Sequence, residues 1–292
     1  MRILLAGAGG QLGRCIQDAI DPNRHQLIAL DRSALNVADG TAVARAVSRL
    51  EPDVVINAAA FTQVDKAQAE PEMAALINIQ GAANLAAASQ LCGALMIQPS
   101  SDYVYDGAKA APYYEDDATG PINVYGFTKL RGEEEVRRRC ERHVILRTSW
   151  LFSKYGQNFV ATVLQLAREK GVLQVVDDQI GCPTFGPDLA AACLALCDAQ
   201  SMGQVTYGVF HFAGDGHVSR YQFAGEICDA AFQQGMLLGQ TEIRPITSNQ
   251  WQAAAPRPLN SRLGVAKFED CFGPVPRNWR QGLDQLIRSG MR

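Results

Sequence analysis

The chain has 292 residues, with 27 Lys and Arg against 30 Asp and Glu, a formal net charge of −3 and 47% hydrophobic residues. This length suits one large domain or two moderate ones, and the composition is typical of a folded globular protein, which excludes a disulfide-stapled miniprotein, a disordered chain and a general polyanion binder. No apolar stretch reaches the roughly 20 residues that span a bilayer, and Met1-Arg2 leads directly into a strand-like segment. We therefore expect a cytoplasmic protein that binds neither membrane nor nucleic acid.

The first half of the chain alternates short β-branched apolar runs with longer alanine-rich segments of helical period. The expected strands are Arg2–Ala6, Gln26–Leu30, Asp53–Asn57, Leu95–Pro99 and Val144–Thr148. The expected helices between them lie near Gly10–Ile20, Thr41–Leu50, Pro71–Cys92 and Val124–Arg142. This alternation is typical of βαβ units around a parallel sheet. It predicts a Rossmann-type, doubly wound α/β domain over residues 1–150.

The second half is richer in Gly and Pro and less regular. Helices are expected near Asn158–Glu169, Pro187–Gln200, Ser219–Gln233 and Trp279–Ser289. This texture predicts a smaller α/β lobe over residues 151–292 that mainly binds substrate, with some segments returning to the first sheet.

Two further features of the sequence have structural rather than chemical interpretations. The run EEEVRRR at 133–139 contains three Glu–Arg pairs at i,i+4 spacing, which predicts a solvated helix face and not a nucleic-acid patch. The eight cysteines form no C-x-x-C pair, so we expect reduced core residues. Cys193 and Cys197 lie four residues apart on one predicted helix, but no second pair of ligands stands nearby, so no metal site is expected.

A glycine-rich loop follows the first strand. Gly7, Gly10 and Gly13 are spaced G-x-x-G-x-x-G before a helix, where glycines permit a tight turn and a close approach of the backbone to a pyrophosphate. Asp31 ends the second strand, near the spacing at which an acid binds the adenosine ribose of NAD. The adjacent Arg32 suits the 2′-phosphate of NADP instead. NADH and NADPH both remain open, as does a plain solvated turn at these two positions.

The segment VYGFTKLRGE places Tyr125 and Lys129 four residues apart, on one face of a helix. A neighbouring ammonium favours the phenolate, so we expect the pKa of Tyr125 to be drawn toward the working range. Such a pair also occurs in helices where Tyr packs and Lys is solvated. The segment PSSDYVYDG at 99–107 follows the fourth strand at the carboxyl edge of the sheet, where Ser101 can hold a carbonyl oxygen beside the phenol. Hydroxyls at strand ends also cap turns. The prediction of an acid–base site therefore depends on Ser101, Tyr125 and Lys129 occurring together, in this order, at one edge of the sheet.

Together these motifs resemble the extended short-chain dehydrogenase/reductase superfamily and, within it, the dTDP-4-dehydrorhamnose reductase family. The resemblance covers nearly the whole chain. Its most specific pieces are GAGGQLG at 7–13, PDVVINAAAFTQVDKAQAE at 52–70, SSDYVYDG at 100–107, NVYGFTKLRGE at 123–133, RTSWLF at 147–152, DQIGCPT at 178–184 and RPLNSRL at 257–263.

The resemblance implies a role for individual residues. Tyr125 would be the proton donor, Lys129 its partner and a ligand of the nicotinamide ribose, and Ser101 the hydroxyl on the substrate carbonyl. The residues implied around the dinucleotide, in addition to Gly7 and Arg32, are Gly10, Gln11, Leu12, Asp31, Ala59, Ala60 and Thr62. Those implied beside the sugar nucleotide are Asp102, Tyr103 and Trp150. Arg257 and Arg262 become candidates for its diphosphate, although without the resemblance they are ordinary surface arginines.

The sequence departs from the family in two places. Ser101 stands where the family usually has Thr, which keeps the hydroxyl but leaves its rotamer freer. Some relatives form metal-bridged dimers through a Glu on the first helix, whereas this stretch reads Arg14-Cys15, so that metal and that dimer are not expected. A homodimer of another kind stays open.

The resemblance implies NADPH- or NADH-dependent reduction of the 4-keto group of a dTDP-linked 4-keto-6-deoxyhexose, giving dTDP-L-rhamnose. The face of the ketosugar that receives hydride stays open, and with it a 6-deoxytalose-type product. One alternative is a sugar-nucleotide epimerase or dehydratase that retains bound NAD. Another is a non-catalytic regulatory subunit of the methionine adenosyltransferase type, against which the intact Ser101, Tyr125 and Lys129 argue.

Overall fold

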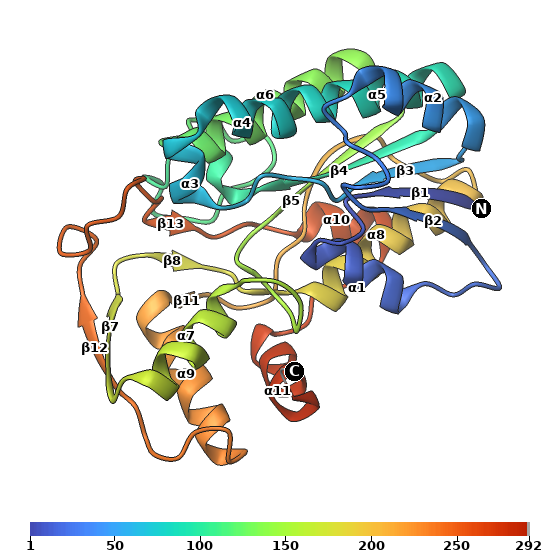
Figure 1. The fold of residues 1–292 in the computed structure, drawn as a ribbon. Helices are drawn as coiled ribbons and strands as arrows, with labels where there is room; N and C mark the ends of the chain where they lie inside the picture. Colours follow the sequence, from blue (N-terminus) through green and yellow to red (C-terminus); the bar gives the residue numbers. More distant parts are fainter. Residues whose placement is uncertain (291–292) are drawn as a thin grey trace.

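The computed structural model describes residues 1–290 and is built around a six-stranded sheet (Figure 1). All its strands are parallel, in the order β10-β5-β4-β3-β1-β2. They are β1 (Arg2–Ala6), β2 (Gln26–Leu30), β3 (Val54–Asn57), β4 (Leu95–Ser101), β5 (His143–Thr148) and β10 (Gly208–His211). The predicted Rossmann-type α/β fold is therefore confirmed. The strand order reverses at β1 and β3, and the crevice outside the carboxyl ends of such strands is where ligands bind.

Helices cover both faces of this sheet (Figure 1). Successive side chains of a strand point to opposite faces, so Ile3 and Leu5 of β1 join one core cluster while Leu4 and Ala6 join another. The first face packs against α1 (Gln11–Ala19), α8 (Gly186–Ser201) and α10 (Ala266–Phe272). The second packs against α2 (Gly40–Leu50), α5 (Ala82–Cys92) and α6 (Val124–Arg139). Apolar strands without alternation fit this two-sided burial.

The region predicted as one helix over Pro71–Cys92 is interrupted. It consists of α4 (Pro71–Ala75), a π-helical turn over Leu76–Gly81 and α5, and the short α3 (Val64–Ala69) precedes it. Single π-helical turns inside α-helices often lie at functional sites. Here the turn carries the buried Asn78, whose contacts are described below.

The remaining elements form a second layer of structure below the sheet in Figure 1. Its core is aromatic and contains Phe152, Phe223 and Trp279. Its helices are α7 (Phe159–Glu169), α9 (Arg220–Gln233) and α11 (Trp279–Ser289). Its short strands pair as β6 (Leu151–Phe152) with β9 (Thr184–Phe185), β7 (Val172–Val176) with β12 (Glu242–Ile246), and β8 (Ile180–Gly181) with both β11 (Val218–Ser219) and β13 (Asn260–Ser261). None of the helices within residues 1–290 combines the length and apolarity needed to cross a membrane.

The prediction of a solvated helix face over residues 133–139 is wrong for Glu133, its first residue. Glu133 is fully buried, and its carboxylate accepts hydrogen bonds from Arg147 Nη2 at 2.7 Å and from Ser100 Oγ at 2.5 Å. Glu135 does pair along the helix, with Arg138 and Arg139. Glu133 is buried because it faces the sheet, where β5 presents a cation that the helix pattern alone does not reveal.

The cysteines behave as core residues. All eight are free thiols and six of them are buried. Cys193 and Cys197 belong to the core between α8 and the sheet, and the Cys197 thiol donates to the backbone carbonyl of Cys193.

Candidate active site

Two adjoining cavities open at the carboxyl edge of the sheet. The larger, about 620 Å³, is lined by the loops after β1, β2 and β3. The smaller, about 340 Å³, extends over β4, β5 and α6 to the second layer. The lining residues that the two share are Gly10, Ala58, Ala60 and Thr62. A long ligand such as a dinucleotide can therefore run from one cavity into the other along the glycine loop.

The glycine loop provides close backbone approach and a helix N-terminus. Gly7 has φ +77°, and a Cβ there would lie 2.3 Å from the backbone nitrogen of Ala59. A Cβ on Gly13 would lie 2.5 Å from the carbonyl oxygen of Gly7, so only glycine lets α1 pack this closely. Helix α1 has no side-chain cap and no acidic residue in its first turn, which leaves the backbone N–H groups of Gln11 and Leu12 for an anion. These features fit the pyrophosphate of a dinucleotide.

Asp31 and Arg32 both line the larger cavity, and their side chains differ in how they are engaged. One oxygen of Asp31, Oδ1, accepts from the Ser33 amide at 2.9 Å, the Ser33 hydroxyl at 2.6 Å and the Ala34 amide at 3.0 Å. These hydrogen bonds, that of the Ser33 hydroxyl first, hold the pKa of Asp31 below its usual range. The exposed guanidinium of Arg32 has neither an ion pair nor a hydrogen bond within the described chain.

The loop with Ala59, Ala60 and Thr62 lies where the two cavities meet. Asn78 holds this loop: its side chain accepts from the Phe61 amide at 2.8 Å and donates to the Phe61 carbonyl at 3.1 Å. Its amide also donates to the Thr128 hydroxyl on α6, at 3.0 Å. The π-helical turn thus fastens the loop to the helix that carries Tyr125, a role that the sequence analysis missed because π-helices have no sequence signal.

Tyr125 and Lys129 both line the smaller cavity. Asn123 caps α6 by accepting from the Gly126 amide, which fixes the first turn on which Tyr125 lies. Burial raises the pKa of Tyr125, and the nearby Ser101 hydroxyl only partly offsets this. The expected lowering toward the working range is therefore not found in this structure, because loss of solvent around the phenol outweighs the polar groups near it.

Lys129 is buried, and its ammonium donates to the Pro99 carbonyl at 2.7 Å. Burial lowers its pKa to about 8, and the Glu133 carboxylate one turn along α6 acts in the opposite direction. Lys129 is thus a buried cation held against Pro99 of β4, in the lining of the smaller cavity.

Ser101 ends β4 and caps the one-turn helix over Asp102–Val104. Its hydroxyl donates to Asp102 Oδ1 at 2.8 Å and accepts from the Tyr103 amide at 3.2 Å. Burial raises the pKa of Asp102 to about 6. Tyr103 packs its ring against that of Tyr125 at 5.6 Å between centroids. Ser101, Asp102, Tyr103, Tyr125 and Lys129 are therefore brought together on one wall.

Unpartnered buried polar atoms gather in this cavity. Five such side-chain atoms occur in the described chain, and those of Gln11, Asp102 and Thr148 belong to residues that line it. Buried polar groups are almost always hydrogen-bonded. Their concentration here indicates a place built for a polar ligand.

Trp150 also lines this cavity, and it is joined there by Arg220, which the sequence analysis did not single out. The Arg220 guanidinium lies over the Trp150 ring, 3.5 Å from its centroid. Arg220 begins α9, in a sequence that reads as an ordinary amphipathic helix, so only the folded chain reveals it.

Arg257 and Arg262 do not line this cavity. Arg257 makes a two-pronged contact with Asp65 on α3, with both N–O distances 2.6 Å. The Arg262 guanidinium donates to Asn260 Oδ1 at 2.9 Å and to the carbonyl of Ala110. Both side chains are thus engaged by this chain's own groups.

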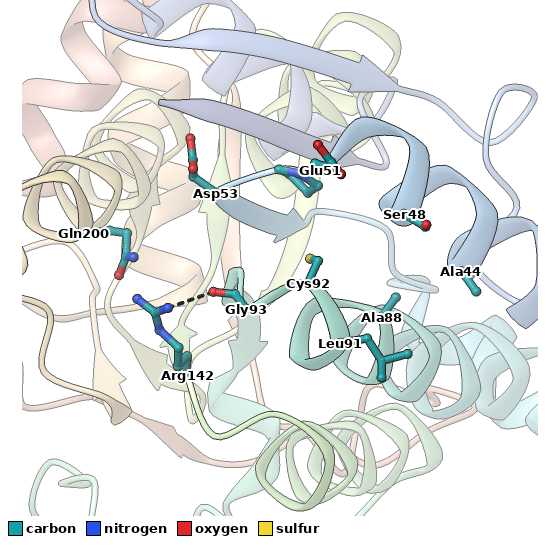
Figure 2. A pocket seen from close by; sticks show the side chains of 11 residues that line it. Ala44, Ser48, Glu51, Asp53, Ala88, Leu91, Cys92, Gly93, Arg142 and Gln200 are labelled. Atoms are coloured by element: carbon teal, nitrogen blue, oxygen red, sulfur yellow. Dashed lines mark hydrogen bonds between the residues drawn. The ribbon is translucent and has the colours of Figure 1, made fainter.

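Another hollow, of about 590 Å³, lies at the opposite, amino edge of the sheet (Figure 2). Its polar groups are satisfied locally: Arg142 donates to the Gly93 carbonyl at 2.9 Å, and Asp53 accepts from the Arg2 amide at 2.7 Å. It lacks the unpartnered buried atoms of the carboxyl edge. The carboxyl edge is therefore the candidate active site.

Comparison with known proteins agrees with this geometry. The profile of the family described as the RmlD substrate binding domain matches residues 1–291. This chain belongs to that family. A dTDP-4-dehydrorhamnose reductase of Aggregatibacter actinomycetemcomitans is 39% identical over 98% of each chain. The structure of a dTDP-4-dehydrorhamnose reductase from Bacillus anthracis in complex with NADP matches with a TM-score of 0.91 and 33% identity, over 99% of each chain.

The resemblance inferred from the sequence motifs is thereby confirmed. A UDP-glucose 4-epimerase of Thermotoga maritima also matches, with a TM-score of 0.81 over 99% of this chain and 98% of the other. At 20% identity this similarity shows a shared fold alone.

Proposed function

We propose that this chain reduces the 4-keto group of a dTDP-linked 6-deoxyhexulose, using NADPH or NADH. Its relatives are named dTDP-4-dehydrorhamnose reductases, which supports this substrate. The observation that carries the proposal is the single wall formed by Ser101, Tyr125 and Lys129, next to a glycine loop suited to a dinucleotide. The NADP complex of the Bacillus anthracis relative supports NADPH as one cofactor.

In this reaction the nicotinamide, when bound, supplies hydride to the carbonyl carbon of the sugar. Tyr125 donates its proton to the carbonyl oxygen, and the raised pKa keeps the phenol protonated at neutral pH, as a donor must be. When the sugar is bound, the Ser101 hydroxyl turns from Asp102 Oδ1 to the same oxygen and polarises it. Lys129 places a desolvated positive charge on this wall, which favours the phenolate that remains.

The groups around the cofactor divide by the part of the dinucleotide they would hold. Gly7, Gly10, Gln11 and Leu12 would hold the pyrophosphate, and Asp31 and Arg32 the adenosine ribose and any 2′-phosphate. Ala59, Ala60, Thr62 and Lys129 would lie along the nicotinamide half.

We infer two domains with the division near residue 150. The second would mainly bind substrate through Trp150 and its neighbours, while α8, β10 and α10 complete the nucleotide-binding domain. The buried free thiols fit a reducing compartment, which supports the cytoplasm as the site of action.

The test is oxidation of NADPH and of NADH by the purified protein, given dTDP-4-dehydro-L-rhamnose generated in place, with and without Mg²⁺. We expect cofactor oxidation in step with formation of dTDP-L-rhamnose. Failure with both cofactors would overturn the proposal. NAD retained through purification, together with such a failure, would point to an epimerase or dehydratase. A co-purifying partner without bound NAD would instead point to a regulatory subunit.

A further inference from the structure

Arg220 is the free cation of the smaller cavity. It lines the cavity together with Tyr125 and Lys129, and its guanidinium lies over two aromatic rings, 3.5 Å from the centroid of Trp150 and 4.7 Å from that of Phe159. No carboxylate of residues 1–290 lies within 4.0 Å of it. The Asp102 carboxylate acts on this half-buried guanidinium only from beyond that distance, so the donors of Arg220 remain for an anionic ligand.

The Trp150 ring beneath Arg220 belongs to a residue with strained backbone. Trp150 is one of only two non-glycine residues within 1–290 with positive φ, at 47°. A Cβ on Gly181 would lie 2.3 Å from Cε2 of its indole, so the ring fits only because that position is glycine. Strained backbone of this kind persists where the surrounding structure fixes it, and it gathers at ligand sites. The strain at Trp150 serves to place the ring under the guanidinium.

The groups beside Arg220 also favour an anion. The buried phenol of Tyr103 lies near both Arg220 and Arg257, and both cations act to lower its pKa against the effect of burial. Arg257 is already paired with Asp65, and Arg262 is bound to Asn260 and a backbone carbonyl. Among these three arginines, Arg220 alone keeps its donors available to a ligand in the cavity.

We propose that Arg220 binds the diphosphate of the sugar nucleotide in this cavity, with the Tyr103 hydroxyl beside it and Trp150 as its support. The inference rests on the proposed function for the identity of the ligand. A planar guanidinium presents two parallel N–H donors to phosphate oxygens, whereas an ammonium is a compact point charge without this fixed fork. The cofactor pyrophosphate has its own place at the N-terminus of α1, so the two anions do not compete.

The experiment compares binding of dTDP and of thymidine by the purified protein, using calorimetry and no catalytic turnover. The variants are Arg220→Met, Arg220→Lys and, as matched control, Arg280→Met. Arg280 is also stacked on a tryptophan, 4.3 Å from the centroid of Trp279, but it is paired with Glu226 on the surface. Comparing the two ligands separates a lost phosphate contact from general damage, which would weaken both.

We expect Arg220→Met to weaken dTDP binding about 10- to 100-fold, as loss of a charged hydrogen-bonding pair does, while thymidine binding stays the same. Arg220→Lys should recover part of the loss, and Arg280→Met should match the wild type. The KM for NADPH should not change in either Arg220 variant.

Several outcomes overturn the inference: no dTDP binding by the wild type, equal losses for dTDP and thymidine, or a rise in the NADPH KM of the same size. If Arg220→Met does not fold, Arg220→Lys serves instead, and the test is again whether its dissociation constant for dTDP rises more than that for thymidine. Arginine-dependent dTDP binding without ketosugar reduction would remove the proposed function and leave this inference standing. Normal ketosugar reduction by the wild type, together with unchanged dTDP binding in Arg220→Met, would remove this inference and leave the proposed function standing.

Discussion

The glycine loop after β1 and the Trp150–Arg220 stack line adjoining cavities, but they are held in place in different ways. The loop depends on backbone: at Gly7 and Gly13, a side-chain methyl group would lie within 3 Å of neighbouring backbone atoms. The stack depends on two side chains, that of Trp150 just before β6 and that of Arg220 at the start of α9, and on the space that Gly181 of β8 leaves for the indole.

The two regions therefore differ in which substitutions they tolerate. A backbone cradle tolerates no side chain and recognises the phosphate common to all dinucleotides. A side-chain stack can change with one substitution and can therefore set which second substrate is accepted. Beside both regions lies the wall with Ser101, Tyr125 and Lys129, to which we assign the chemistry.

Tyr125→Phe should produce the largest effect. Removing the proton donor should lower kcat about 10²- to 10⁴-fold, the range for general acid catalysis, with little change in NADPH affinity. Steady-state kinetics and a fluorescence titration with NADPH measure the two quantities. Tyr155→Phe is a control, because the Tyr155 hydroxyl donates to Asp18 outside this wall. A Tyr125→Phe enzyme with near-normal kcat would remove Tyr125 from its assigned role.

Glu133→Gln should mainly lower stability. Glu133 and Arg147 form a fully buried pair, and Arg147 also donates to the Tyr105 hydroxyl at 2.7 Å. Leaving one buried charge unpaired costs about 3–5 kcal/mol, which urea unfolding would measure. The double variant Glu133→Gln with Arg147→Met should recover part of that loss. If the single variant unfolds at the wild-type midpoint, the pair does not support the wall.

The wild-type kcat/KM should fall on the alkaline side because of Lys129. Its pKa is lowered to about 8, so the ammonium is present below that pH and lost above it. Tyr125, with its raised pKa, stays protonated through the same range. We expect kcat/KM to be level below pH 8 and to fall about tenfold per unit well above it.

Lys129→Arg tests this assignment, because a guanidinium keeps its charge throughout the range. The variant should be slower but should lose the alkaline fall. An unchanged fall in the variant would assign it to another group. Circular dichroism across the same pH range would show whether unfolding contributes.

The sequence predicted those parts of the molecule that depend on local pattern. The five expected strands are present with their ends shifted by at most two residues, since buried parallel strands read as continuous apolar runs. The glycine loop and the Tyr125–Lys129 spacing are likewise contained in short segments. They could be read without knowing what lies opposite them in the fold.

The features that escaped prediction depend on partners distant in the chain. Glu133 was assigned to solvent because its partner Arg147 lies 14 residues away on a strand beneath it. Arg220 meets Trp150 only in the folded chain, where the start of α9 lies beside the indole ring. The four residues of β10 are too few to identify as a sheet strand until β5 lies beside them. Local pattern therefore predicts the cofactor end better than the substrate end.

The cofactor end nevertheless leaves one choice open, and Arg32→Ala should settle it with the smallest effect. Asp31 Oδ1 is fully used by the Ser33 and Ala34 groups, so Oδ2 alone remains for a ribose hydroxyl, whereas Arg32 has no partner within residues 1–290. A free guanidinium at the place proposed for the adenosine ribose favours a 2′-phosphate. We expect the wild type to prefer NADPH, and Arg32→Ala to reduce the ratio of kcat/KM for NADPH over NADH about tenfold, as for one partly exposed charged contact. Because NADH lacks the phosphate, its own kcat/KM should stay the same and serves as the internal control. If Arg32→Ala leaves the NADPH-to-NADH ratio of kcat/KM unchanged, the choice of cofactor depends on a side chain from elsewhere in the fold, as we propose for the substrate. Lys66, which lines the same cavity, would then be the next residue to replace.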